Sequence, residues 1–178
     1  PARVAPGTPM HADPAALDAL ADRLVNAKQP VIVAAAAGRH EASFHNLVKL
    51  AEAVGAGVID QYDRLNFPGD HPLNITRMAN SVLGNADCLL ALDSRNLYAA
   101  ISREDPKTGR NEYITPKDCW IAEIGYRDVD PSIWAEEVYQ VVPVDLQITA
   151  NTLVALPGLL ERVQARLADN PAAQAAAA

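Results

Sequence analysis

The stretch Val31-Ile32-Val33-Ala34 decides the fold, because it is a continuous apolar run that contains three β-branched residues. Such a run is typical of a strand that is buried on both faces, and strands of this kind belong to parallel sheets covered by helices. The run begins after Gln29-Pro30, a pair that ends the preceding segment. We therefore expect a central parallel strand here, and the flanking segments decide what covers it.

Amphipathic helices are predicted on both sides of this strand. Before it, Asp13 suits an N-cap and Pro14 suits the first helical position, and apolar residues then recur at helical spacing as far as about Lys28. After it, a second apolar stripe runs from Phe44 to Val54 and stops at Gly55. This helix–strand–helix order favours a right-handed βαβ arrangement.

Further strands are predicted from short apolar runs at Val58-Ile59, Cys88–Leu92, Trp120–Ile124 and Glu137–Val142. A weaker helix is expected over residues 75–83, and residues 105–111 have the composition of a charged turn. Alternating strands and helices predict an α/β fold of Rossmann-like type. We expect three layers, α/β/α, around a parallel sheet of about five or six strands.

The last predicted element is a helix that Asp145 caps, with leucines and a valine at helical spacing facing inward from Leu146 to Leu167. Pro157-Gly158 lies inside this segment. A proline in a helix interior removes a hydrogen bond and clashes with the preceding turn. We therefore expect a kink there, or a split into two helices.

The 178 residues, 49% of them hydrophobic, are sufficient for one domain with a proper core. Residues 1–13 are proline-rich and lack hydrophobic periodicity, which predicts a linker, and residues 169–178 predict a second linker or tail. The folded domain is expected over residues 14–168. A linker at each end and no initiator methionine indicate the middle piece of a larger protein.

Charge and composition exclude several classes of partner. The chain has 15 Lys and Arg against 22 Asp and Glu, a net charge of -7, which disfavours nucleic acid and anionic membranes. No apolar run approaches the roughly 20 residues of a membrane span, and the N-terminus lacks the apolar stretch of a signal peptide. Cys88 and Cys119 lie in apolar contexts, so we predict buried free thiols in a cytoplasmic protein.

Two loops are candidates for nucleotide contacts. In a dinucleotide-binding fold the ligand lies after the first strand, where glycines allow close approach of the pyrophosphate. Here that loop keeps only Gly38, and Arg39 follows as a phosphate contact; the alternative is a plain strand-to-helix turn. After the third strand, Asp93 could accept a ribose hydroxyl and Arg95 could bind phosphate. The alternative is that Asp93 organises the turn and Arg95 pairs with a neighbouring carboxylate.

The histidines do not form a catalytic or metal-binding set. His71 lies in the turn-rich corner Phe67–Leu73, but no serine or cysteine elbow accompanies it, so triad chemistry lacks a nucleophile. His40 and His45 are five residues apart and share a helix face poorly. We interpret the corner as structural, we place His40 beside the helix start and His45 on the solvent side, and we predict no catalytic residue and no metal site.

Five segments resemble known sequence patterns in the same order: Ala27–Val33 (AKxPVI), Leu50–Gly55 (LAExxG), Asn66–Leu73 (FPxDHPL), Ala86–Arg95 (ADxxLxLGxR) and Val144–Leu146 (GD). Together they resemble the central domain of thiamine diphosphate-dependent enzymes of the acetolactate synthase-like family. The similarity spans residues 15–167.

This resemblance implies a parent enzyme, a lyase or transferase that acts on a 2-oxo acid and assembles as a homo-oligomer. Its partners within the same chain would be a pyrimidine-binding and a diphosphate-binding domain, which hold thiamine diphosphate and magnesium. The central domain binds FAD or ADP in some members and serves as a scaffold and subunit interface in others. Because the catalytic glutamate and the metal ligands belong to the outer domains, no residue here inherits those roles.

The sequence departs from the FAD-binding pattern of that family in three places. The glycine-rich first loop has become Ala34–Gly38, residues 74–80 replace a glycine- and methionine-rich stretch, and Asp93 replaces a glycine. A carboxylate at this position opposes an anionic cofactor by like-charge repulsion, although Arg95 still matches the family's arginine. A non-catalytic central domain is therefore the leading hypothesis. The alternatives are a stand-alone FAD-, ADP- or NAD-binding module and a pure oligomerisation scaffold.

Overall fold

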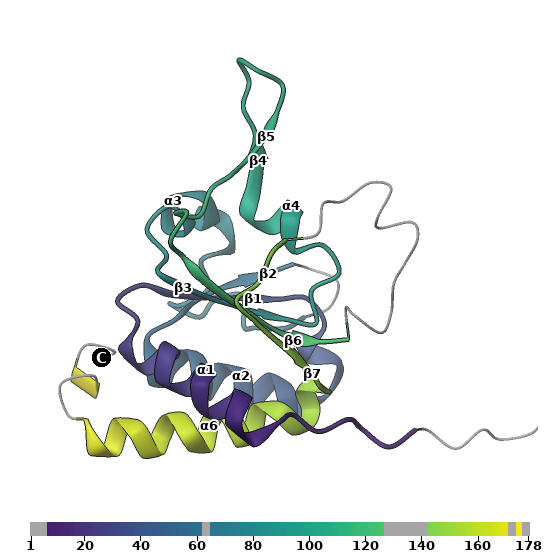
Figure 1. The fold of residues 1–178 in the computed structure, drawn as a ribbon, viewed down its shortest axis with the longest axis vertical. Helices are drawn as coiled ribbons and strands as arrows, with labels where there is room; N and C mark the ends of the chain where they lie inside the picture. Colours follow the sequence, from purple (N-terminus) through teal and green to yellow (C-terminus); the bar gives the residue numbers. More distant parts are fainter. Residues whose placement is uncertain (1–6, 62–64, 127–141, 171–173, 176–178) are drawn as a thin grey trace, which may run out of the picture.

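The computed structural model describes residues 7–61, 65–126, 142–170 and 174–175. Figure 1 shows a central sheet with α1, α2 and α6 on one face and α3 and α4 on the other. The elements are α1 Pro14–Asn26, β1 Pro30–Ala34, α2 Glu41–Val54, β2 Gly57–Asp60, α3 Ala79–Leu83, β3 Cys88–Leu92, α4 Leu97–Ile101, β4 Ser102–Glu104, β5 Asn111–Tyr113, β6 Trp120–Gly125, β7 Leu146–Thr149 and α6 Thr152–Asp169, with short 3-10 turns at Ala37–Arg39 and Thr76–Met78.

The main sheet has five strands in the order β2-β1-β3-β6-β7, and each of its four pairings is parallel. β1 pairs with β2 on one side and β3 on the other, and all five of its residues are buried. The predicted fold class, a three-layer Rossmann-like α/β domain with a parallel sheet, is confirmed. The apolar run Val31–Ala34 thus forms an interior strand of the sheet, paired on both sides.

The core is divided by the sheet into two clusters, as the alternation of side chains along a strand requires. Ile32 and Ala34 join the cluster that includes α1, α2 and α6. Val31 and Val33 face the opposite cluster, which includes Leu83 of α3 and residues of α4. Burial on both faces explains why the strand sequence shows no polar alternation.

The predicted helix boundaries are largely confirmed. The Asp13 carboxylate accepts a hydrogen bond from the Ala15 backbone N–H at 3.2 Å, and α1 begins at Pro14. α2 ends at Gly55, which adopts the left-handed conformation with φ of 64°. A glycine pays no Cβ penalty there, which explains the stop. The weak helix expected over residues 75–83 is a 3-10 turn followed by α3.

The prediction that Asp145 caps the closing helix is wrong. Leu146–Thr149 form β7, and α6 begins at Thr152 with Asn151 as its N-cap. Asp145 instead binds the neighbouring strand: its carboxylate accepts from the Ile121 N–H at 2.8 Å, and its own N–H donates to the Ile121 carbonyl at 2.8 Å. A contact across 24 residues therefore overrides the local helix signal. Most of the strand predicted at Glu137–Val142 lies outside the described residues.

Of the kink or split expected at Pro157-Gly158, the split does not occur, because α6 is one helix from Thr152 to Asp169. Pro157 removes only one backbone donor, and buried leucines on both sides of it hold the helix against the core. Gly158 lies where α6 approaches α1, since a Cβ there would lie 3.4 Å from Leu17 Cδ1.

The charged turn predicted at residues 105–111 connects β4 to β5, an antiparallel pair that Figure 1 shows projecting from the body of the domain. These two strands form a small sheet of their own. Across the described part of the chain, no helix combines the length and apolar content needed to cross a membrane.

Candidate functional site

A ligand crevice is expected where the strand order of an open α/β sheet reverses, outside the carboxyl ends of the strands. In this sheet the reversal lies between β1 and β3, because the chain passes from β1 to β2 on one side and then to β3 on the other. The loops after these two strands carry the four residues predicted from the sequence, Gly38, Arg39, Asp93 and Arg95. The geometry of this crevice is therefore the test of the nucleotide hypothesis.

Arg39 and Asp93 bind each other across the crevice. Arg39 Nη2 lies 3.0 Å from Asp93 Oδ2, and Thr152 Oγ1 of α6 donates to the same carboxylate oxygen at 2.7 Å. The Asp93 side chain is only 6% exposed, whereas that of Arg39 is 36% exposed. The cation that could bind a phosphate is therefore engaged by an internal carboxylate.

The backbone of Asp93 is held in an unusual conformation. Its φ is 50°, the only positive φ of a non-glycine residue within the described ranges. Aspartate tolerates this left-handed region better than most residues. The Asp93 N–H donates to the Ile124 carbonyl at 2.9 Å, which fixes the loop against β6. This geometry directs the carboxylate toward Arg39.

Hydrogen bonds from the Asn66 side chain hold the loop after β1 in place. Its buried amide nitrogen lies within hydrogen-bond distance of Ala34 O, Ala35 O and Asp60 Oδ1, at 3.2, 2.9 and 2.8 Å. Its side-chain oxygen accepts from the Gly38 N–H at 2.9 Å. The Asp60 carboxylate also accepts from the Asn66 N–H at 3.0 Å. The side chain of Asn66, just before the corner segment, thus bonds to backbone groups of the candidate phosphate loop.

Gly38 is required here by a close contact between two loops. A Cβ on Gly38 would lie 2.0 Å from the Leu65 carbonyl oxygen, a distance that only movement of the backbone could relieve. The next N–H, that of Arg39, donates to the Ala36 carbonyl at 3.1 Å. An anion cradle needs free N–H groups, and these two are already bonded. The loop therefore has the geometry of a packed turn.

Arg95 does not join this cluster. It is exposed, and within the described residues it makes no hydrogen bond or ion pair, so neither its predicted carboxylate partner nor any other is present there. Its neighbour Ser94 instead donates to Gln61 Oε1 at 2.7 Å, and Gln61 Nε2 donates to the Asn96 carbonyl at 3.1 Å. These bonds tie the loop after β2 to the loop after β3.

Sequence reasoning missed several members of this network, namely Asp60, Gln61, Asn66 and Thr152. Asp60 and Gln61 lie at the carboxyl end of a predicted strand, where polar residues gather in such folds, so that rule could have found them. Asn66 directly precedes the Phe67–Leu73 corner. Thr152 is 59 residues from Asp93 and had no such signal.

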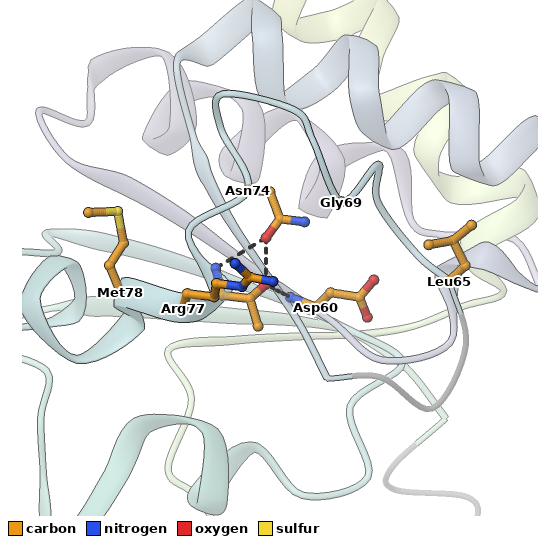
Figure 2. Close-up of a pocket in the computed structure, with 7 residues that line it drawn as sticks. Asp60, Leu65, Gly69, Asn74, Arg77 and Met78 are labelled. Carbon is orange, nitrogen blue, oxygen red and sulfur yellow. Dashed lines mark hydrogen bonds between the residues drawn. The ribbon is translucent and has the colours of Figure 1, made fainter.

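A pocket of about 550 Å³ lies beside the crevice, at the end of β2 (Figure 2). The Asp60 N–H donates to Thr76 Oγ1 at 3.0 Å, and this hydroxyl donates to Asn74 Oδ1 at 2.7 Å. These three lining residues are thus bonded to one another, whereas Arg77 is exposed. Leu65 and Met78 are 69% and 57% exposed. The complete lining is Asp60, Leu65, Gly69, Asn74, Thr76, Arg77 and Met78.

His71 anchors the corner segment to α2. Its Nδ1 accepts from the Leu73 N–H at 3.1 Å, so in the neutral ring the remaining proton is on Nε2, which lies 3.3 Å from Glu52 Oε1. The ring also contacts Phe67 edge to face, with 4.8 Å between centroids. These contacts give His71 a structural role. His40 directly precedes α2 and His45 is exposed beside Glu41, as predicted.

The prediction of two buried free thiols is confirmed. Burial, followed by the charge of Cys119, raises the pKa of the Cys88 thiol from 9.0 to about 12. Burial is also the main cause that raises the pKa of Cys119 from 9.0 to about 11. Since the thiolate is the reactive form of cysteine, neither residue has the character of a nucleophile near neutral pH.

The donors of this chain do not fit a magnesium–diphosphate group. Among the residues that the structure describes, no group of three or more His, Cys, Asp and Glu side chains could hold a metal ion. Magnesium prefers several oxygen ligands around one point. The polar groups at the sheet edge are instead bonded to one another, as the Arg39–Asp93 and Asp60–Asn66 contacts show.

Comparison with known proteins agrees with this architecture. The family model described as "Thiamine pyrophosphate enzyme, central domain" matches residues 17–156. Two similar solved structures are a protein described as a thiamin diphosphate-dependent enzyme from Mycobacterium smegmatis (TM-score 0.63, 21% identity) and benzoylformate decarboxylase from Polynucleobacter necessarius (TM-score 0.63, 18% identity). They cover 92% and 91% of this chain, which in turn spans only 30% and 29% of theirs. No curated relative matches the chain.

Proposed function

This chain belongs to the thiamine pyrophosphate enzyme family, as its central domain, and we propose that it is a non-catalytic scaffold and interface domain of an acetolactate synthase-like enzyme acting on a 2-oxo acid. The family implies thiamine diphosphate as the cofactor of the whole enzyme and further domains in the same chain. In this proposal a pyrimidine-binding and a diphosphate-binding domain hold that cofactor and its magnesium. The enzyme is a cytoplasmic homo-oligomer.

The observation that supports a scaffold domain over a nucleotide-binding one is the Arg39–Asp93 ion pair at the edge of the sheet. A nucleotide phosphate at this edge would have to displace a carboxylate that is 6% exposed and also bonded to Thr152. It would meet loop N–H groups that are bonded to Asn66 and Ala36. Each of these contacts would be lost without an equivalent replacement, which disfavours binding.

The substrate class is supported by two likenesses. The five sequence motifs resemble those of acetolactate synthases and their relatives. One of the similar structures is a benzoylformate decarboxylase, and benzoylformate is a 2-oxo acid. In this proposal the domain contributes position and assembly to the enzyme. Its buried polar groups bind one another and so hold the fold together.

The ligand test uses thermal unfolding of the chain with FAD, ADP or NAD. A ligand at 100 times its Kd stabilises the folded state by about 2.7 kcal/mol, a shift of several degrees for a domain of this size. We expect no shift with any of the three. A reproducible shift of several degrees would support the other hypothesis, a dinucleotide-binding module, and would contradict the scaffold proposal.

The parent activity is tested on the full-length protein that contains this domain. Consumption of 2-oxo acids should require added thiamine diphosphate and magnesium after both are removed by dialysis. Adding FAD or ADP should leave the rate unchanged. Turnover that persists without thiamine diphosphate would contradict the assigned chemistry, and a requirement for FAD would contradict the proposed role of the central domain.

A further inference from the structure

The β4–β5 hairpin forms an exposed arm, which we define as residues 102–113. Figure 1 shows it projecting away from the sheet and its covering helices. All three residues of β5 are exposed, and those of β4 are exposed or half-buried. An isolated two-stranded hairpin is at best marginally stable in water. An arm of this construction is stabilised when another strand adds to its edge.

The hydrogen-bond pattern shows which backbone groups face outward. The Ile114 N–H donates to the Ile101 carbonyl at 2.7 Å, and the Asp105 N–H donates to the Arg110 carbonyl at 2.8 Å. Successive residues of a strand direct their backbone groups to alternate sides. The N–H and C=O groups of Asn111 and Tyr113 therefore point away from β4. No partner for them exists within the part of the chain that the structure describes.

The arm carries equal numbers of positive and negative side chains. Arg103, Lys107 and Arg110 are matched by Glu104, Asp105 and Glu112, and none of the six makes an ion pair among the described residues. A uniformly acidic or basic partner would leave half of these charges opposed. A second copy of this chain carries both signs of charge in the same pattern, so a register exists in which opposite charges meet.

We propose that the outer edge of β5 pairs antiparallel with β5 of a second copy, about a two-fold axis at Asn111. In this register Arg110 lies directly opposite Glu112 of the second copy, and symmetry repeats the pair. Opposite charges in directly opposed cross-strand positions are stabilising, and like charges are destabilising. The Tyr113 ring contacts the Tyr98 ring of its own chain, with 5.7 Å between ring centroids, and takes no part in the proposed charge pairing.

Other symmetric registers also use outward backbone groups, but an axis at Tyr113 on β5 or at Ser102 on β4 forms no reciprocal ion pair. An axis at Glu104 on β4 opposes Arg103 to Asp105 of the second copy, but it also opposes Glu104 to itself, which is destabilising. Only the β5 edge centred on Asn111 combines free backbone groups with two reciprocal ion pairs and no like-charge contact. This inference rests on the proposed function, because it identifies one surface through which the proposed scaffold domain would assemble.

Cross-linking tests the register in the intact chain, even where association is weak. Directly opposed, hydrogen-bonded residues have Cα atoms about 5.5 Å apart, within the roughly 4.4–6.8 Å that a disulfide spans. Asn111→Cys should therefore form a symmetric disulfide dimer under mild oxidation. The two native thiols are buried and have raised pKa values, so they should not compete. Lys107→Cys, equally exposed at the tip of the arm, is the matched control.

We expect Asn111→Cys to cross-link at least tenfold faster than Lys107→Cys. In the Asn111→Cys background, Arg110→Gln removes both ion pairs and should slow the reaction by about twofold to thirtyfold. Arg103→Gln removes the same charge from the same arm outside the proposed contact and should leave the rate unchanged. Equal rates at positions 111 and 107, or equal effects of Arg103→Gln and Arg110→Gln, would overturn the proposal. The nucleotide test remains valid in either case.

Discussion

The crevice at the ends of β1 and β3 and the exposed arm use similar residues in opposite ways. In the crevice, Arg39 and Asp93 lie 3.0 Å apart and a buried amide occupies the adjacent backbone groups. In the arm, Arg103 and Glu112 are cross-strand neighbours, yet within the described residues neither makes an ion pair. The first region has satisfied its polar groups internally, and the second has left them for solvent or a partner.

This difference indicates where the domain interacts with other molecules. A fold of this type normally places its ligand in the crevice at the switch of strand order. Here that edge is occupied by side chains of the domain itself, such as the paired Arg39 and Asp93. The charged arm projects away from the body of the domain (Figure 1). Interaction through the surface, and not through the crevice, is therefore the consistent interpretation.

The largest expected effect is a loss of folding in the crevice. Gly38→Ala places a Cβ 2.0 Å from the Leu65 carbonyl oxygen, so two loops must separate. We expect the free energy of unfolding to fall by about 3 kcal/mol or more, at the upper end of overpacking effects. Urea unfolding measures it. Gly84→Ala, where the nearest atom is 3.8 Å away, is the control and should change stability by less than about 1 kcal/mol. Similar losses in both variants would contradict the proposed contact.

A smaller effect on stability, but a new binding property, is expected from Asp93→Gly. The substitution relieves the positive φ of 50° and removes the partner of Arg39. The relief of backbone strain offsets only part of the loss, because the Asp93 carboxylate is 6% exposed and also accepts from Thr152, so the free energy of unfolding should fall by about 1–3 kcal/mol. The freed guanidinium should then bind phosphate groups.

Isothermal titration with ADP should detect this binding in Asp93→Gly and not in the unmodified chain. The double variant Arg39→Gln with Asp93→Gly is the control, because it has the open crevice without the cation. If the double variant binds equally well, Arg39 is not the phosphate contact. If Asp93→Gly does not bind ADP at all, the ion pair is not what closes the crevice.

The fold could be predicted because its signals are local. The apolar run at Val31–Ala34, the cap at Asp13 and the stop at Gly55 each depend on neighbouring residues, and each is confirmed. β7 could not be predicted in the same way. Asp145 has the sequence character of a helix cap, but its carboxylate binds the Ile121 N–H on the adjacent strand. A tertiary hydrogen bond decided that element.

The candidate site likewise has a part that the sequence could predict and a part that it could not. Arg39 and Asp93 were individually predictable, because polar residues that follow parallel strands gather at one edge of the sheet. That they bind each other was not predictable, since 54 residues separate them. Thr152, which completes the cluster from α6, is another 59 residues away from Asp93. The sequence identified the edge of the sheet at which a ligand would bind. Only the folded structure showed that the polar side chains at this edge bind one another.

The smallest expected effect is in the arm, and it shows whether the two regions unfold together. Gly109 has a φ of 64°, and a Cβ there would meet only Glu104 Oε1, at 3.9 Å. Gly109→Ala therefore introduces backbone strain of roughly 1–2 kcal/mol without a clash. Because the arm is a separate sheet with few buried contacts, this strain should open it locally.

Hydrogen exchange separates local from global unfolding in this variant. The amide of Asp105, which bonds to the Arg110 carbonyl within the arm, should exchange about fivefold to thirtyfold faster. The amide of Ala35, bonded to the Leu92 carbonyl beside the crevice, should be unaffected, and so should the melting temperature. A fall in melting temperature comparable to that of Gly38→Ala would show that the arm belongs to the same cooperative unit as the crevice. In that case the contrast between the two regions would concern exposure alone, because they would share a single unfolding transition.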